Sequence, residues 1–84
     1  MNNETIIQQF INQRSYDLRP SGKRLSIRDG KLYSYNLLIA EFNSQGDVIV
    51  YDHRATGRGF VSMTTSHHVS AVVREVPSRR LILA

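Results

Sequence analysis

The sequence contains no cysteine and no tryptophan. Without cysteine the chain cannot form disulfides, thiolate zinc sites or iron–sulfur clusters, and it has no cysteine nucleophile. No apolar run is longer than four residues, whereas a membrane-spanning helix needs roughly 20. The first residues also lack the basic and apolar regions of a signal peptide. We therefore expect a cytoplasmic protein that does not enter a membrane.

Positive charge is only in modest excess, with 11 Lys and Arg against 7 Asp and Glu and a net charge of +4. The excess is divided equally between the two halves of the chain, so no block of like charge forms a nucleic-acid arm. Most of the bases are Arg, whose planar guanidinium pairs with phosphate or carboxylate and stacks on rings. The basic surface therefore suits phosphates or an acidic protein face, and a merely solvated surface is the alternative.

The length of 84 residues predicts a single small α+β domain, residues 1–84. Apolar stripes of helical spacing predict an N-terminal helix over 3–14 and a C-terminal helix near 66–76. Between them, alternating runs predict a four- to five-stranded antiparallel sheet of hairpins, including a short strand over 60–63. We expect the C-terminal helix to pack on this sheet. Residues 79–84 form either an added edge strand or an apolar tail.

The first hairpin is predicted by Asp29-Gly30 between two alternating runs, because this dipeptide favours a two-residue hairpin turn. The turn pairs Arg28 with Lys31, and it places the apolar side chains of both strands on one face. The opposite face carries bases interleaved with tyrosines: Arg24, Arg28, Lys31, Tyr33 and Tyr35. Arg and Tyr are typical of contact surfaces, so we predict that these five residues bind a partner.

A second hairpin is predicted to join residues 37–42 to residues 48–52 through a five-residue loop. In this register one face of the hairpin belongs to the core and carries Leu38, Ala40, Phe42, Val48 and Val50. The reverse face carries Ile39, Ile49 and Tyr51 around Glu41. This reverse face is unusually apolar, so it is either covered or an interface.

A loop over residues 53–59 is the second candidate site, since it holds two Arg and two Gly. Its bases Arg54 and Arg58 join the predicted partner-binding residues. The predicted anion-binding residues are two glycines and two hydroxyl residues at the start of the second helix: Gly57, Gly59, Thr65 and Ser66. The plain alternative is that Thr65 or Ser66 caps the helix and the glycines turn the chain. Neither of the glycine-rich nucleotide-binding motifs, G-x-x-x-x-G-K-[ST] and G-x-G-x-x-G, occurs in the sequence, which excludes a nucleotide-binding fold.

The three histidines, His53, His67 and His68, lack the spacing of a metal site, and we expect neither a metal nor a cofactor. We expect His67 to be exposed and His68 to be partly packed. No nucleophile motif or carboxylate pair suggests catalysis, and so small a chain has little volume for a deep pocket. We therefore predict that the protein is not an enzyme.

Three short stretches carry a resemblance: Leu32-Tyr33-Ser34-Tyr35-Asn36, the step Ile39-Ala40, and the helix start Thr64-Thr65-Ser66-His67-His68. They resemble a group of small phage-encoded proteins of uncharacterised function. The resemblance covers about half of the chain. It implies a compact α+β fold, a phage origin and a location in the cytoplasm of the host cell. Small phage proteins of this size often bind and block, and some inhibit host defences such as CRISPR systems.

Three functional hypotheses follow. The first is a non-enzymatic phage accessory protein that binds and blocks a host protein or nucleoprotein complex, including a defence inhibitor of the CRISPR type. The second is a nucleic-acid-binding module, in which tyrosines stack on bases and Arg residues, Arg74 among them, neutralise phosphates. The third is a structural subunit that forms a homodimer or larger oligomer, either through residues 79–84 or through the apolar reverse face of the second hairpin.

Overall fold

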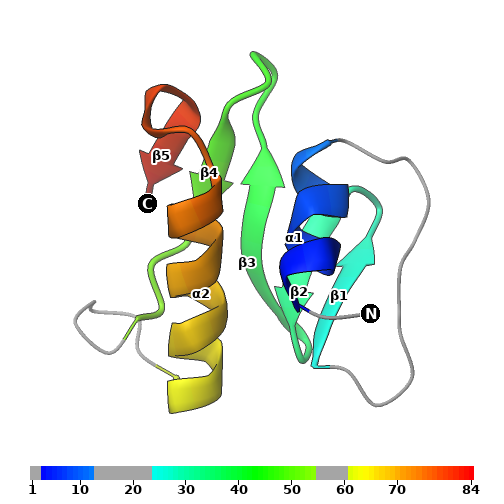
Figure 1. The fold of residues 1–84 in the computed structure, drawn as a ribbon, viewed down its shortest axis with the longest axis vertical. Coiled ribbons are helices and arrows are strands. Elements are labelled where there is room, and N and C mark those ends of the chain that lie inside the picture. Colours follow the sequence, from blue (N-terminus) through cyan, green and yellow to red (C-terminus); the bar gives the residue numbers. More distant parts are fainter. Residues whose placement is uncertain (1–2, 13–23, 55–60) are drawn as a thin grey trace.

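The fold follows the predicted α+β class in a computed structural model that describes residues 3–12, 24–54 and 61–84. The elements, labelled in Figure 1, are α1 (Asn3–Ile11), β1 (Leu25–Arg28), β2 (Lys31–Ser34), β3 (Leu37–Phe42), β4 (Val48–Val50), α2 (Met63–Glu75), the 3-10 helix η1 (Ser78–Arg80) and β5 (Leu81–Leu83). Among the described residues, neither helix is both long and apolar enough to cross a membrane.

The strands form one sheet in the order β1-β2-β3-β4-β5, and the first four are antiparallel neighbours. The predicted registers of both hairpins are confirmed where the strands pair: Arg28 lies opposite Lys31, and Phe42 lies opposite Val48. The first turn forms because Asp29 and Gly30 adopt φ values of 54° and 74°. Positive φ at both positions gives the twist that a two-residue hairpin requires.

The last strand, β5, lies parallel to β4, with Val48 beside Leu81. The sheet is therefore mixed, and the prediction of a wholly antiparallel sheet is wrong at this strand. The reason is the connection: the chain leaves β4, returns through α2 and enters β5 in the direction of β4, as parallel neighbours require. Residues 81–83 are thus an added edge strand, which was the first of the two alternatives for this segment.

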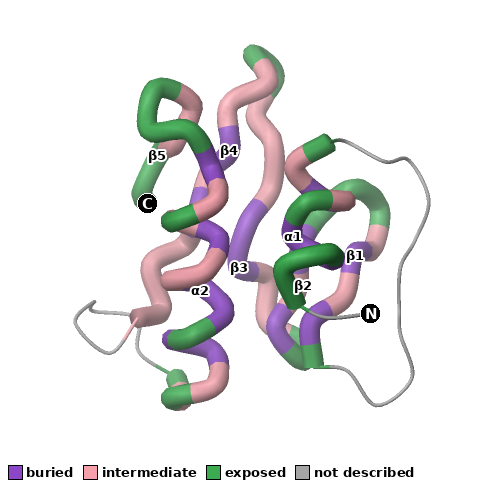
Figure 2. Tube along the Cα trace, viewed as in Figure 1, coloured by how far each residue is buried: buried purple, intermediate pink, exposed green. Residues whose placement is uncertain are grey.

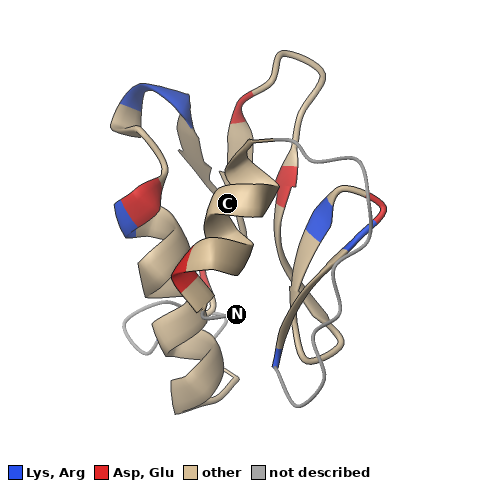
Figure 3. Ribbon diagram, turned by 45° about the vertical axis from the view of Figure 1, so that its right-hand side comes forward, with Lys and Arg blue, Asp and Glu red and all other residues tan. Residues whose placement is uncertain are grey.

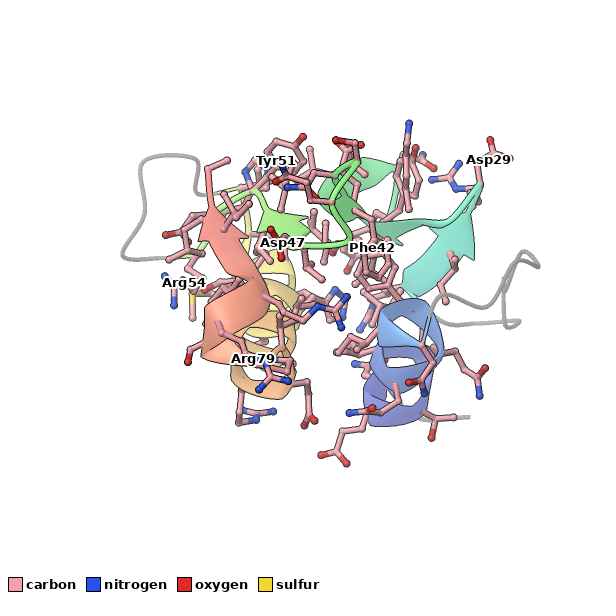
Figure 4. The ribbon with its side chains drawn as sticks, turned by 90° about the horizontal axis from the view of Figure 1, so that it is seen from above. Asp29, Phe42, Asp47, Tyr51, Arg54 and Arg79 are labelled. Carbon is pink, nitrogen blue, oxygen red and sulfur yellow. The ribbon has the colours of Figure 1, made fainter. Side chains whose placement is uncertain are left out.

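Both helices lie beneath the same face of the sheet, α1 beside β1 and β2 and α2 beside β4, as Figure 4 shows from above. Figure 2 shows that both helices and the strands of the sheet contain buried residues. The buried apolar residues are Ile6, Ile7, Phe10, Leu25, Ile27, Leu32, Ile39, Ala40, Val48, Val50, Val69, Val72 and Val76. Phe42 adds its ring, 5.0 Å from that of Phe10. No described element covers the opposite face of the sheet.

A β-bulge in β3 corrects the predicted core face. Leu32 lies opposite Ala40, but the next residue, Tyr33, lies opposite Leu38, so Ile39 is an extra residue in β3. Such an insertion reverses the alternation of side chains along the strand. As a result Ile39 belongs to the core, whereas Leu38 pairs with Tyr33 and lies outside the core cluster. The sequence predicts the reverse arrangement, with Leu38 on the core face and Ile39 on the other face.

The start of α2 lies earlier than predicted, at Met63 rather than near residue 66. Ser62 is the N-cap, and its hydroxyl accepts a hydrogen bond of 3.1 Å from the backbone N–H of Thr65. This cap satisfies one of the free N–H groups at a helix start. The predicted strand over 60–63 is therefore wrong in its described part, residues 61–63, because the chain there turns into the helix.

Candidate functional site

Three of the residues predicted to bind a partner, Arg28, Lys31 and Tyr33, lie on the uncovered side of β1 and β2, while Arg24 directly precedes β1 and Tyr35 directly follows β2 at the other end of the hairpin. We call Arg24, Arg28, Lys31, Tyr33 and Tyr35 the Arg–Tyr face. Arg24, Lys31 and Tyr35 are exposed, and the other two are half-buried. Figure 3 shows the basic residues of this hairpin in two places, beside the acid at the β1–β2 turn and at the opposite end of the hairpin, all separate from the basic residues at the end of α2 and in η1. Five of the seven predicted partner-binding residues therefore lie along this one hairpin.

Arg28 stacks on Tyr33, with its guanidinium carbon 4.0 Å from the centre of the ring. This is a cation–π contact between neighbouring strands. Nη2 of Arg28 also donates a long hydrogen bond of 3.4 Å to the carbonyl of Tyr35. The Nε atom is buried and has no hydrogen-bond partner among the described residues. The guanidinium of Arg28 is thus held over the Tyr33 ring.

Tyr35 stands in the turn between β2 and β3 with φ 58°, in the left-handed region. That conformation costs a residue with a side chain about 1–2 kcal/mol relative to a right-handed one. Its N–H donates a hydrogen bond of 2.6 Å to the carbonyl of Arg24, whose guanidinium lies 6.0 Å from the centre of the ring. The ring is 49% exposed. An exposed aromatic ring is therefore held in a strained turn between two Arg residues.

The rest of the uncovered face is less basic. The hydroxyl of Tyr51 donates a hydrogen bond of 2.5 Å to Oε2 of Glu41, and Tyr51 points away from the helices in Figure 4. Because this bond stabilises the protonated phenol, together with partial burial and the charge of Glu41, the pKa of Tyr51 is raised above its usual value. Ile49 pairs with Ile82 of β5, which is 40% exposed. This half of the face is more apolar and carries an acid–phenol pair.

Arg54, predicted to bind a partner, forms a two-pronged ion pair with Asp52. Its Nε lies 2.8 Å from Oδ1 and its Nη2 lies 3.0 Å from Oδ2. The hydrogen bonds from Arg54 hold the pKa of Asp52 below its usual value. The remaining predicted residues of this loop, Arg58, Gly57 and Gly59, lie outside the described residues. Arg74 is exposed in the last turn of α2, away from the Arg–Tyr face.

Thr65 and Ser66, predicted to hold an anion, are both buried near the start of α2. Their backbone N–H groups donate to the hydroxyl and the carbonyl of Ser62, respectively. The cap that the sequence analysis assigned to Thr65 or Ser66 is therefore Ser62. Thr65 does not act as the cap, because its hydroxyl faces the sheet and contacts Ser34 of β2.

A buried chain of hydroxyls joins α2 to β2 at this point. Ser62 donates to Oγ1 of Thr65 at 3.1 Å, Oγ1 of Thr65 lies 3.1 Å from Oγ of Ser34, and that oxygen lies 2.7 Å from Nδ1 of His68. We call Ser34, Thr65 and His68 the hydroxyl–histidine cluster. Its members come from two separate stretches of the sequence, residues 32–36 and 64–68. The sequence analysis did not single out Ser34, although a polar residue opposite Leu25 on the core face was a usable signal.

The histidine of this cluster is 5% exposed, and the expectation that His68 is packed and His67 exposed is confirmed. Burial lowers the pKa of His68, and the charges of Arg24 and His67 lower it further. In a neutral imidazole Nδ1 either accepts the Ser34 proton or donates its own to Ser34 Oγ, according to the tautomer. Hydroxyl and imidazole have the spacing of a nucleophile and its base, but Ser34 is completely buried. Burial of that hydroxyl favours a structural role for the pair.

Among the described residues, no group of three or more His, Asp and Glu side chains is arranged to hold a metal ion. Comparisons with protein-family models, with curated proteins and with solved structures find no match to this chain.

Proposed function

We propose that this chain is a non-enzymatic binding protein that uses the Arg–Tyr face to bind and block a host macromolecule, in the manner that its resemblance to small phage proteins implies. The observation that carries the proposal is the stack of Arg28 on Tyr33 beside the exposed ring of Tyr35. Arg and Tyr are the residue types that most often dominate binding energy at interfaces. A defence complex of the host, of the CRISPR type, is the finer form of this proposal.

The charge of the Arg–Tyr face supports an electronegative partner. Arg28 and Lys31 lie opposite each other on two adjacent strands, and Arg24 directly precedes the first of these strands. Arg24 and Lys31 are exposed, whereas Arg54 is neutralised by its ion pair with Asp52. Their charge is therefore available for phosphate or for an acidic protein surface.

The first experiment compares two charge reversals that change the net charge equally. Lys31→Glu alters the Arg–Tyr face, and Arg79→Glu alters an exposed residue of η1. The tagged variants and the wild type are used to capture partners from a bacterial host lysate, with and without nuclease treatment. We expect Lys31→Glu to lower the captured amount about tenfold, equivalent to about 1.4 kcal/mol, and Arg79→Glu to leave it unchanged. Equal capture by both variants contradicts the proposal.

A nucleic-acid-binding module is the second candidate, favoured by the alternation of aromatic and basic side chains on this face. In such modules, exposed aromatic rings on a sheet stack on the nucleobases while Arg and Lys contact the phosphates. Three phosphate contacts to a single strand correspond to a slope of about −2 in log affinity against log salt, or a loss of about 20-fold between 50 and 200 mM. Fluorescence anisotropy of a labelled oligonucleotide measures this slope. Salt-independent binding contradicts this candidate.

A further inference from the structure

A cavity of about 560 Å³ lies next to the Arg–Tyr face, where the turn between β2 and β3 approaches the start of α2. Pockets that bind small ligands commonly have volumes of about 300–1,000 Å³. Its lining residues come from these two segments: Ser34, Tyr35, Asn36 and Leu37 on one side, and Val61, Ser62, Thr64 and Thr65 on the other. Tyr35 belongs both to the cavity wall and to the Arg–Tyr face. A ligand on the face can therefore continue into the cavity.

The wall of the cavity combines apolar surface with a few polar groups. Leu37 and Val61 provide aliphatic surface, and Val61 is 58% exposed at the rim. Asn36 contributes a carboxamide, which offers both a donor and an acceptor in one plane, and Thr64 contributes a hydroxyl. This combination suits a flat, partly apolar group whose edge carries hydrogen-bonding atoms.

The ring of Tyr35 is the link between the cavity and the charges of the face. Its turn has a positive φ that Gly or Asn adopts without strain, so a tyrosine at this position has an energetic cost. Strained residues that persist in a fold often serve a function. Here the strained turn places an aromatic ring at the mouth of the cavity, with Arg24 beside the ring and Arg28 bonded to the carbonyl of the same residue.

We infer that the cavity holds the base of one nucleotide of a single-stranded nucleic acid, stacked on Tyr35, while adjacent phosphates contact Arg24 and Arg28. This inference rests on the second proposed function, the nucleic-acid-binding module. A base has the required shape and edge chemistry, and the strand provides negative charge next to it. A single strand is required because a base in a duplex is already stacked and paired. Stacking on an aromatic side chain contributes about 1–3 kcal/mol per base.

The first test replaces the ring at the mouth of the cavity. Tyr35→Gly removes the ring and also relieves the positive φ, so the variant is expected to fold, whereas Tyr35→Phe keeps the ring. Affinity is measured by fluorescence anisotropy with labelled 12-nucleotide strands of thymidine, deoxyadenosine, uridine and adenosine at 50 mM salt. We expect Tyr35→Gly to weaken binding at least fivefold and Tyr35→Phe to remain within twofold of the wild type. The four strands also establish whether DNA or RNA is preferred.

The second test places a negative charge at the cavity rim. Val61→Glu precedes the N-cap of α2, where an acid is favourable to the helix. Its matched control is Ser78→Glu, an exposed residue beyond the opposite end of α2. We expect Val61→Glu to weaken binding at least fivefold and Ser78→Glu to weaken it less than twofold. Circular dichroism and melting temperatures verify that all variants are folded.

The outcomes separate the inference from the function on which it rests. In one outcome, Lys31→Glu weakens oligonucleotide binding but Tyr35→Gly and Val61→Glu do not. The oligonucleotide then crosses the Arg–Tyr face without entering the cavity. In that case the inference is wrong, whereas the nucleic-acid function stands. If the wild type binds none of the four strands at 50 mM salt, the nucleic-acid function itself is wrong. The blocked macromolecule is then to be sought among acidic proteins.

Discussion

Replacement of Ser34 by Ala tests whether the hydroxyl–histidine cluster holds α2 against the sheet. The Ser34 hydroxyl is completely buried and lies within hydrogen-bond distance of both Thr65 and His68. Without it, Nδ1 of His68 loses the 2.7 Å contact, whereas Thr65 keeps the hydrogen bond donated by Ser62. The variant therefore leaves one buried polar atom, Nδ1 of His68, without its partner, which costs about 1–3 kcal/mol.

A loss of about 2 kcal/mol lowers the melting temperature of a domain of this size by about 8–16 °C. The assay is thermal and urea unfolding followed by circular dichroism. Ser70→Ala is the matched control, because Ser70 lies on α2 and is only half-buried. We expect the control to change the melting temperature little, since Ala is a better helix former than Ser.

A double-mutant cycle isolates the contact itself. His68→Leu removes the other partner, so the double variant with Ser34→Ala no longer contains the unsatisfied ring nitrogen. We expect the double variant to be about 1 kcal/mol more stable than the sum of the two single effects predicts, a typical coupling for residues in one network. Strict additivity, or a melting temperature of Ser34→Ala within 2 °C of the wild type, would refute the reasoning.

Three further predictions concern the same fold. Because the pKa of His68 is lowered on folding, the unfolded chain binds more protons in mildly acidic solution, so the free energy of unfolding should fall as the pH drops below about 6.5. Urea unfolding between pH 7.5 and 5 should show this fall, and a smaller one in His68→Leu. Ser62→Ala removes the N-cap bond to Thr65 and should cost about 1 kcal/mol by the same assay. Phe10→Ala deletes a buried ring that packs against Phe42; a loss of about 3–5 kcal/mol should leave the chain largely unfolded by circular dichroism at 25 °C.

Local chemistry made the two hairpins predictable. Asp29-Gly30 determines a two-residue turn, and this turn fixes every pairing of β1 with β2. The loop of the second hairpin is equally self-contained, since the side-chain oxygen of Asn43 accepts hydrogen bonds from the N–H groups of Gln45 and Asp47. The gathering of the Arg–Tyr face follows from the first register alone. This part of the candidate site was therefore readable from the sequence.

The features that were missed depend on contacts between distant segments. The bulge at Ile39 brings an extra apolar residue into the core, and no turn residue marks it in the sequence. The parallel pairing of β5 with β4 depends on the path of α2 across the sheet. The cavity and the bond between Ser34 and His68 likewise exist only where the turn after β2 meets the start of α2. Short-range sequence patterns carry no information about such contacts between distant segments.

The central claim is that the Arg–Tyr face is the surface through which this protein contacts its partner. Site-specific photo-crosslinking tests this claim most directly, with a benzophenone amino acid placed at Lys31 or, as the control, at Arg79, both of which are exposed. After irradiation in a host lysate, we expect a discrete covalent adduct from position 31 and none from position 79. An adduct from position 79 alone, or none from position 31 while the protein still captures its partner, would contradict the account.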